Sequence, residues 1–108
     1  MNLHSLDEGR GNTVLLIHAF PLDHTMWAPQ IAALKDRYRV IAPDVRGFGQ
    51  TAAGSPWSLD QVADDLNQLL DGLKVEDCAV VGLSMGGYVA LPFYDRYGHR
   101  VRCGTIRR

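Results

Sequence analysis

The chain has 108 residues, of which 46% are hydrophobic and 21% are charged, and its formal net charge is −1. This length allows one domain, residues 1–108, and the near-neutral charge excludes the broad basic surface with which proteins bind nucleic acid. No apolar run approaches the roughly 20 residues that span a bilayer, and the polar N-terminus lacks the apolar segment of a secretory signal. The two cysteines have neither zinc-site nor disulfide-framework spacing. We therefore expect a cytoplasmic protein with free thiols and with no nucleic-acid or membrane partner.

Short apolar runs alternate with segments of helical periodicity along the chain. Residues 2–9 are a candidate edge strand that turns at Gly9 and Gly11. The run 13–18 is continuously apolar and rich in β-branched side chains, as strands buried on both faces are. Residues 25–36 repeat large apolar side chains at helical spacing, and 38–43 has the pattern of a second buried strand.

The second half of the chain repeats this alternation. A serine followed three residues later by glutamine predicts a capped helix over 58–73, with leucines on one side and aspartates on the other. The run 78–83 predicts a third buried strand, and 85–97 predicts a helix bent at Pro92. The segment 100–108 is a weak strand at best, because it lacks an apolar run.

This order of elements predicts an α/β fold in three α/β/α layers around a mostly parallel sheet. We expect the 13–18 strand to lie between the 38–43 and 78–83 strands and parallel to both. The helices at 58–72 and 85–97 are expected on opposite faces of the sheet. Sites in such sheets form beyond the carboxyl ends of the strands, so the loops after these three strands hold the candidate functional residues.

The segment Gly82-Leu83-Ser84-Met85-Gly86 matches G-x-S-x-G between a predicted strand and a predicted helix. In a nucleophile elbow, so sharp a turn forces the serine into positive φ and exposes its Oγ, while the glycines leave room for neighbouring chain. The Met85 amide starts the helix without an intrahelical partner, so it would stabilise the oxyanion that forms when Ser84 attacks a carbonyl.

Two other interpretations of this turn stay open. It is a plain glycine-rich turn if Ser84 serves only as a helix N-cap, and it is an anion site if the helix amides alone hold a ligand. A phosphate loop is disfavoured, because the lysine and second hydroxyl of that motif are absent.

The loop after the first buried strand, 18–27, is apolar where a surface loop would be polar. This composition predicts the wall of a site, in which the Phe20 amide is a second oxyanion donor. We expect His18 to be hydrogen-bonded within its loop and to brace it, and His24 to be an exposed residue near the start of the next helix. In the third loop, 44–51, the glycines suit a tight reversal, and Asp44 and Arg46 are expected to tie the loop together.

Three motifs in this order carry a resemblance: LLIHAFPLDHTMW at 15–27, RVIAPDVRGFGQT at 39–51 and VVGLSMGGYVAL at 80–91. Together they resemble the α/β-hydrolase superfamily, and above all its carboxylesterase and enol-lactonase-like members. A serine in the elbow, in place of aspartate, is unlike dehalogenases and epoxide hydrolases.

The resemblance implies a role for each residue of the site. Ser84 is the nucleophile, Phe20 and Met85 supply the oxyanion amides, and His18 shapes the oxyanion loop, with Gly82 and Gly86 in support. The chain also departs from the family pattern. Ala19 replaces a glycine, Pro92 lies inside the nucleophile helix, and the family's cap, triad acid and triad histidine come after the elbow. We therefore expect the N-terminal half of a hydrolase core, without those segments.

No histidine in the sequence is placed to act as base for Ser84. His4 is at the amino side, His18 is in the oxyanion loop, and His99 follows a helix that puts it about 20 Å from the elbow. Asp23 and Asp44 could approach the site but have no evident partner.

The sequence predicts a serine hydrolase of small esters or lactones that acts through an acyl-enzyme and is weakly active or inactive as this chain. The alternative is a non-catalytic acyl- or anion-binding or assembly domain that keeps the elbow. Neither interpretation needs a cofactor or a metal. The uncovered edge of the predicted sheet invites self-association.

Overall fold

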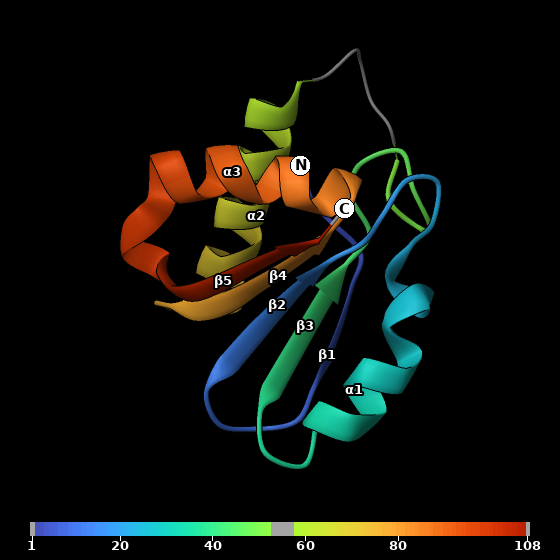
Figure 1. Cartoon of the computed structure of the whole chain (residues 1–108), viewed down its shortest axis with the longest axis vertical. Helices are drawn as coiled ribbons and strands as arrows, with labels where there is room; N and C mark the ends of the chain where they lie inside the picture. The colour runs from blue at the N-terminus through green and yellow to red at the C-terminus, as the bar shows by residue number, and fades with distance from the viewer. Residues whose placement is uncertain (1, 53–57, 108) are drawn as a thin grey trace.

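A five-stranded sheet runs through the protein in the order β1-β3-β2-β4-β5 (Figure 1). The structure, a computed structural model, describes residues 2–52 and 58–107. β2 pairs in parallel with both β3 and β4, and β1 pairs antiparallel with β3. The α/β fold and the central place of β2 are therefore confirmed. The strands are β1 (Ser5–Glu8), β2 (Thr13–Ile17), β3 (Arg39–Pro43), β4 (Cys78–Leu83) and β5 (Val101–Arg107).

The helices begin and end close to where their local signals predict. Ser58 and Gln61 form both bonds of a capping box, since the Ser58 amide donates to Gln61 Oε1 (2.7 Å) and the Gln61 amide donates to Ser58 Oγ (3.2 Å). In the described ranges none of the helices has the length and apolar character needed to cross a bilayer. The helices are η1 (His24–Trp27), α1 (Ala28–Leu34), α2 (Leu59–Gly72), α3 (Met85–Tyr97) and η2 (Gly98–Arg100).

The helices cover the sheet unequally. α1 and η1 pack on one face through Trp27 and Ile31, whereas α2 and α3 pack side by side on the other (Figure 1). The prediction of opposite faces for α2 and α3 is wrong. Right-handed crossovers explain the arrangement. The chain steps one way along the sheet from β2 to β3, then the other way from β3 to β4 and from β4 to β5, so α2 and α3 share a face.

β5 is a fuller strand than its sequence predicts. It pairs in parallel with β4 from Cys78↔Val101 to Leu83↔Arg107, with one irregularity between Cys78 and Ala79. β5 lies at the edge of the sheet, and its backbone hydrogen bonds to β4 do not depend on apolar side chains. An apolar pattern is therefore not needed for this strand to form. Residue 108 of the predicted segment lies outside the described residues.

Two smaller predictions are confirmed. The turn between β1 and β2 passes through Gly9 and Gly11, whose φ angles are 88° and 108°. Cys103 is opposite Ala79 on the neighbouring strand, and both Cys78 and Cys103 carry free thiols.

Candidate active site

Ser84 lies at the turn that joins β4 to α3. Its backbone has φ 55° and ψ −114°, so the predicted positive φ is confirmed. The residue is exposed, and its side chain makes no capping hydrogen bond to α3. A non-glycine residue in this region is strained, and such strain is typical of functional sites. The N-cap interpretation of Ser84 therefore has no hydrogen bond to support it.

Two glycines make this sharp turn sterically possible. A Cβ on Gly82 would lie 2.4 Å from the carbonyl oxygen of Gly86, where the start of α3 folds back over β4. A Cβ on Gly86 would lie 2.1 Å from the carbonyl oxygen of Ile17, at the end of β2. Both positions therefore require glycine for close backbone approach.

The hydrogen bonds of α3 begin at Gly87, the third residue of the helix. Gly87 and Tyr88 donate their amides to the carbonyl oxygen of Ser84, at 2.9 and 3.2 Å. The Met85 amide comes before both and has no partner within the helix. It lies at the positive end of the helix dipole, next to Ser84 in the chain.

The loop that leaves β2 begins beside the Ser84 turn, because Gly86 approaches the backbone of both Ile17 and His18. The loop turns on a hydrogen bond from the Leu22 amide to the Ala19 carbonyl oxygen (2.8 Å), and its Phe20–Pro21 peptide bond is cis. The Phe20 side chain is 66% exposed and meets the ring of Phe48 edge-on at 5.7 Å. The structure thus brings together the two loops that carry the predicted oxyanion amides.

His18 is fully buried, and both of its ring nitrogens are engaged. Nδ1 donates to the carbonyl oxygen of Ala19 (3.0 Å), and Nε2 accepts from the amide of Val45 (3.0 Å). The ring is therefore neutral with its proton on Nδ1, since only that tautomer satisfies both bonds. His18 braces its own loop, as predicted, and also fastens it to the loop after β3.

Asp44 is the centre of a hydrogen-bond network that the sequence did not predict. Its Oδ1 accepts from the amide and from Nδ1 of His24, both at 2.8 Å. Its Oδ2 accepts from Nδ1 of His4 and from the amide of Gln50, both at 3.0 Å. The prediction of an exposed His24 is wrong, because its side chain is only 15% exposed and packs against Asp44. Asp44 therefore has partners after all, drawn from three separate segments.

Burial alone would raise the pKa of Asp44, whose side chain is inaccessible to solvent. The hydrogen bonds from the Gln50 and His24 amides and from the two imidazoles outweigh that cost and lower the pKa from 3.8 to about 2. Asp44 is therefore a carboxylate at neutral pH. The ligand-type atoms of His4, His24 and Asp44 all lie within 4.8 Å of one another.

The predicted pairing of Asp44 with Arg46 is wrong, and Asp23 has a partner within its own loop. Arg46 does not pair with Asp44, but forms a two-pronged ion pair with Asp65 of α2, in which Nε and a terminal guanidinium nitrogen each donate at 2.7 Å. Asp23 caps η1 by accepting from the amide of Thr25 (2.9 Å). The 44–51 loop is thus anchored to α2 on one side and to the N-terminal segment on the other.

The residue types gave partial signals for these contacts. Asp44 directly follows a buried strand, which marks it as a loop anchor, but its partners are 20 and 40 residues away. Asp65 lies three residues after Val62 and four before Leu69, so helical periodicity places it beside the apolar face of α2, but its partner Arg46 is 19 residues away.

The chain matches a family model described as the alpha/beta hydrolase fold over residues 12–107. It is 40% identical over 78 residues to 3-oxoadipate enol-lactonase 1 of Acinetobacter baylyi, covering 72% of this chain and 29% of the relative. It is also 40% identical over 94 residues to non-heme chloroperoxidase CPO-A1 of Kitasatospora aureofaciens, covering 85% of this chain and 34% of the relative.

Among solved structures, a thermophilic esterase from Thermogutta terrifontis superposes with a TM-score of 0.93 at 42% identity, covering 98% of this chain and 40% of the esterase. The chain spans between 29% and 40% of the length of these three relatives. Because the family model and these relatives extend over most of its residues, the chain belongs to the α/β-hydrolase family.

Proposed function

We propose that Ser84 is the nucleophile of a serine hydrolase that cleaves carboxylic esters or lactones. The observation that carries this proposal is the exposed, positive-φ serine at the junction of β4 and α3. Its Oγ attacks the substrate carbonyl and forms a tetrahedral oxyanion. The alkoxide then leaves and takes up a proton, and water hydrolyses the acyl-Ser84 ester to release the acid and free serine.

In this proposal the turn is a nucleophile elbow, and the amides of Phe20 and Met85 form the oxyanion hole. Support comes from the unpaired start of α3 at Met85 and from the contact of Gly86 with the end of β2, where the Phe20 loop begins. His18 keeps that loop in place through the bond to Val45.

Ester or lactone chemistry is supported by the relatives, one of which is an enol-lactonase and another an esterase. We propose a small molecule with one electrophilic carbonyl as the substrate, because that is the group a serine nucleophile attacks. The free thiols of Cys78 and Cys103 support the expectation of a reducing, cytoplasmic location.

We also propose that this chain by itself turns over slowly. Three of the four histidines are engaged elsewhere, His18 by its two backbone bonds and His4 and His24 by Asp44, and the fourth, His99, lies in η2 beyond the far end of α3. A serine hydroxyl is a weak nucleophile without a base. Oxyanion amides and binding alone leave an acceleration on the order of 10³ over water.

The experiment is covalent labelling with a fluorophosphonate, followed by mass spectrometry of the modified peptide. We expect slow labelling at Ser84, complete loss in Ser84→Ala, and no change in the matched control Ser5→Ala. Hydrolysis of p-nitrophenyl acetate should be weak and should fall to the background rate in Ser84→Ala. Equal labelling of wild type and Ser84→Ala would exclude Ser84 as the nucleophile.

The second candidate is a non-catalytic acyl- or anion-binding or assembly domain, favoured by the engagement of His4, His18 and His24 in other hydrogen bonds. It predicts saturable binding of a carboxylate without any covalent adduct. Failure of labelling together with carboxylate binding that perturbs the Met85 amide in NMR spectra would decide for this alternative.

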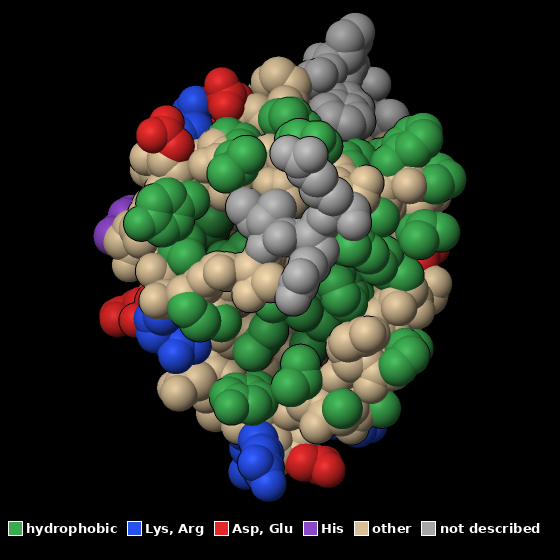
Figure 2. Space-filling model, in the orientation of Figure 1, with side chains coloured by type: hydrophobic (Ala, Val, Ile, Leu, Met, Phe, Trp, Pro, Cys, Tyr) green, Lys and Arg blue, Asp and Glu red, His purple; other side chains and the backbone are tan. Residues whose placement is uncertain are grey.

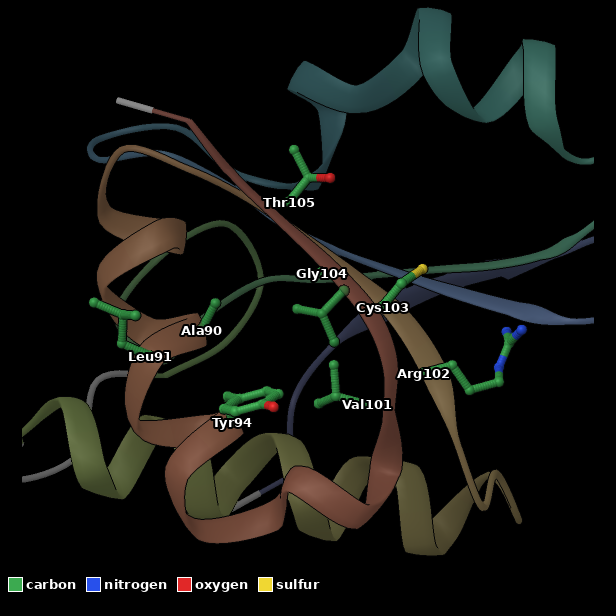
Figure 3. Close-up of a pocket in the computed structure, with 9 residues that line it drawn as sticks. Ala90, Leu91, Tyr94, Val101, Arg102, Cys103, Gly104 and Thr105 are labelled. Carbon is green, nitrogen blue, oxygen red and sulfur yellow. The ribbon is translucent and has the colours of Figure 1, made fainter.

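The self-association expected from the sequence has a specific surface in the structure. β5 pairs only with β4 among the described strands, and beside it α3 exposes Leu91 (55%) and Tyr94 (64%). These side chains and Val101 line a hollow of about 490 Å³ (Figure 3). Figure 2 shows hydrophobic side chains spread over the face seen in Figure 1, with charged groups at its rim.

We propose that a second copy covers this hollow, with the two β5 edges paired antiparallel about a two-fold axis. Arg102 does not oppose this pairing strongly, because Asp77 compensates its charge at 2.9 Å. Light scattering after size exclusion should give a dimer for wild type and for Tyr88→Glu, which is outside the hollow, and a monomer for Tyr94→Glu. A monomeric wild type at high concentration would contradict the proposal.

A further inference from the structure

We propose that His4, His24 and Asp44 form a binding site for one divalent transition-metal ion of the Zn²⁺ type. The three residues come from different segments: the stretch before β1, the first residue of η1 and the residue after β3. One imidazole nitrogen of each histidine and a carboxylate oxygen of Asp44 all lie within 4.8 Å of one another. Within the described parts of the chain, this is the group of three possible metal-ligating side chains that come so close together. The cluster includes neither Ser84 nor the proposed oxyanion donors, and its metal binding does not depend on the function proposed for them.

The donor set has the chemistry that such ions prefer. Two imidazole nitrogens and one carboxylate, with a position left open for water, are a common ligand set for zinc and other first-row transition metals. The ring centroids of His4 and His24 are 5.2 Å apart and the planes are tilted by 53°. Both rings therefore direct Nδ1 at the same carboxylate, one toward each of its oxygens.

Only a small rearrangement is needed to admit an ion. The Nδ1–Oδ distances are now 3.0 Å for His4 and 2.8 Å for His24. Metal–ligand bonds of about 2.1 Å at a tetrahedral angle separate two donor atoms by about 3.4 Å, so with both Asp44 oxygens facing the ion each nitrogen–oxygen pair opens by about half an ångström. A ring that binds the ion through Nδ1 carries its proton on Nε2, which is the form of imidazole that ligates metals.

The surroundings hold the carboxylate and leave the site open. Asp44 keeps its bonds from the amides of His24 and Gln50, which orient it as outer partners orient metal ligands. The carboxylate itself is buried, but the side chain of His4 is 36% exposed and that of His24 is 15% exposed, so a hydrated ion reaches them from solvent.

The binding test uses the full chain without a polyhistidine tag, in a Cys103→Ser background so that the exposed thiol does not compete. Zn²⁺ is titrated by calorimetry, and Co²⁺ by its visible absorption. We expect one equivalent to bind, a higher unfolding temperature with Zn²⁺, and at least ten-fold weaker binding in His4→Gln and in His24→Gln. The control His99→Gln should bind as the parent does.

NMR of the unmutated chain keeps the test independent of whether the variants fold. Zn²⁺ should shift the Nδ1 resonances of His4 and His24 and leave that of the buried His18 unchanged. Absence of saturable binding up to millimolar Zn²⁺, persistence of binding in the His4→Gln/His24→Gln double variant, or shifts confined to His99 would each overturn the proposal and leave the cluster a hydrogen-bonded clasp.

Discussion

Replacing Gly86 with alanine should break the junction between β2 and α3 on which the Ser84 turn rests. The added Cβ would lie 2.1 Å from the carbonyl oxygen of Ile17, 2.8 Å from its carbonyl carbon and 2.9 Å from the carbonyl oxygen of His18. Real Cβ atoms essentially never approach closer than 3.0 Å. All three obstructing atoms are backbone, so no side chain can rotate away and the strand and helix must separate by about 1 Å.

Overpacking of this kind costs about 3 kcal/mol at the upper end of its usual range, because both sides of the contact are backbone. With a denaturant dependence of roughly 1.5 kcal/mol per molar urea, the unfolding midpoint should fall by about 2 M. The matched control is Gly72→Ala, where a Cβ meets nothing within 4 Å. It lies at the end of α2, and alanine there should stabilise the protein by about 0.5 kcal/mol.

Urea unfolding followed by circular dichroism and tryptophan fluorescence measures both variants. A Gly86→Ala midpoint within the error of wild type would refute the close approach of β2 and α3, and with it the structural argument for the elbow. If the variant is destabilised but folded, we also expect fluorophosphonate labelling of Ser84 to be lost, because the two loops that carry the proposed oxyanion donors move apart.

Three further predictions concern other contacts. Arg46→Ala should destabilise the protein by about 2–3 kcal/mol, because Asp65 loses both guanidinium hydrogen bonds in a largely buried position. A urea unfolding midpoint equal to that of wild type would refute this prediction. Iodoacetamide at neutral pH should modify only Cys103 in the folded protein, because burial raises the pKa of the Cys78 thiol to about 11. Two adducts are expected in guanidinium, and two adducts on the folded protein would contradict this prediction. His18→Ala should cost about 2–4 kcal/mol through a cavity and a buried amide left without its acceptor, and a loss below 1 kcal/mol would contradict the bracing role.

The local features of this protein were predictable from the sequence. β2 and β3 are buried on both faces over almost their whole length, and β4 is buried at alternate residues and half-buried between them; the apolar runs of all three strands identify them without reference to the rest of the fold. The capping box at Ser58 and the positive φ of Ser84 follow from residues within a few positions. Each depends on short-range sterics or hydrogen bonding, which the local sequence determines.

Other features were decided by the tertiary structure, because they depend on which segments meet. The shared face of α2 and α3 follows from the direction in which the chain steps along the sheet. β5 forms because its backbone hydrogen-bonds to the edge of β4. Asp44 meets His4 across 40 positions, and Arg46 meets Asp65 across 19. Ion pairs and hydrogen bonds between distant residues leave no periodicity in the sequence, so only the folded chain selects which aspartate is buried against which partner.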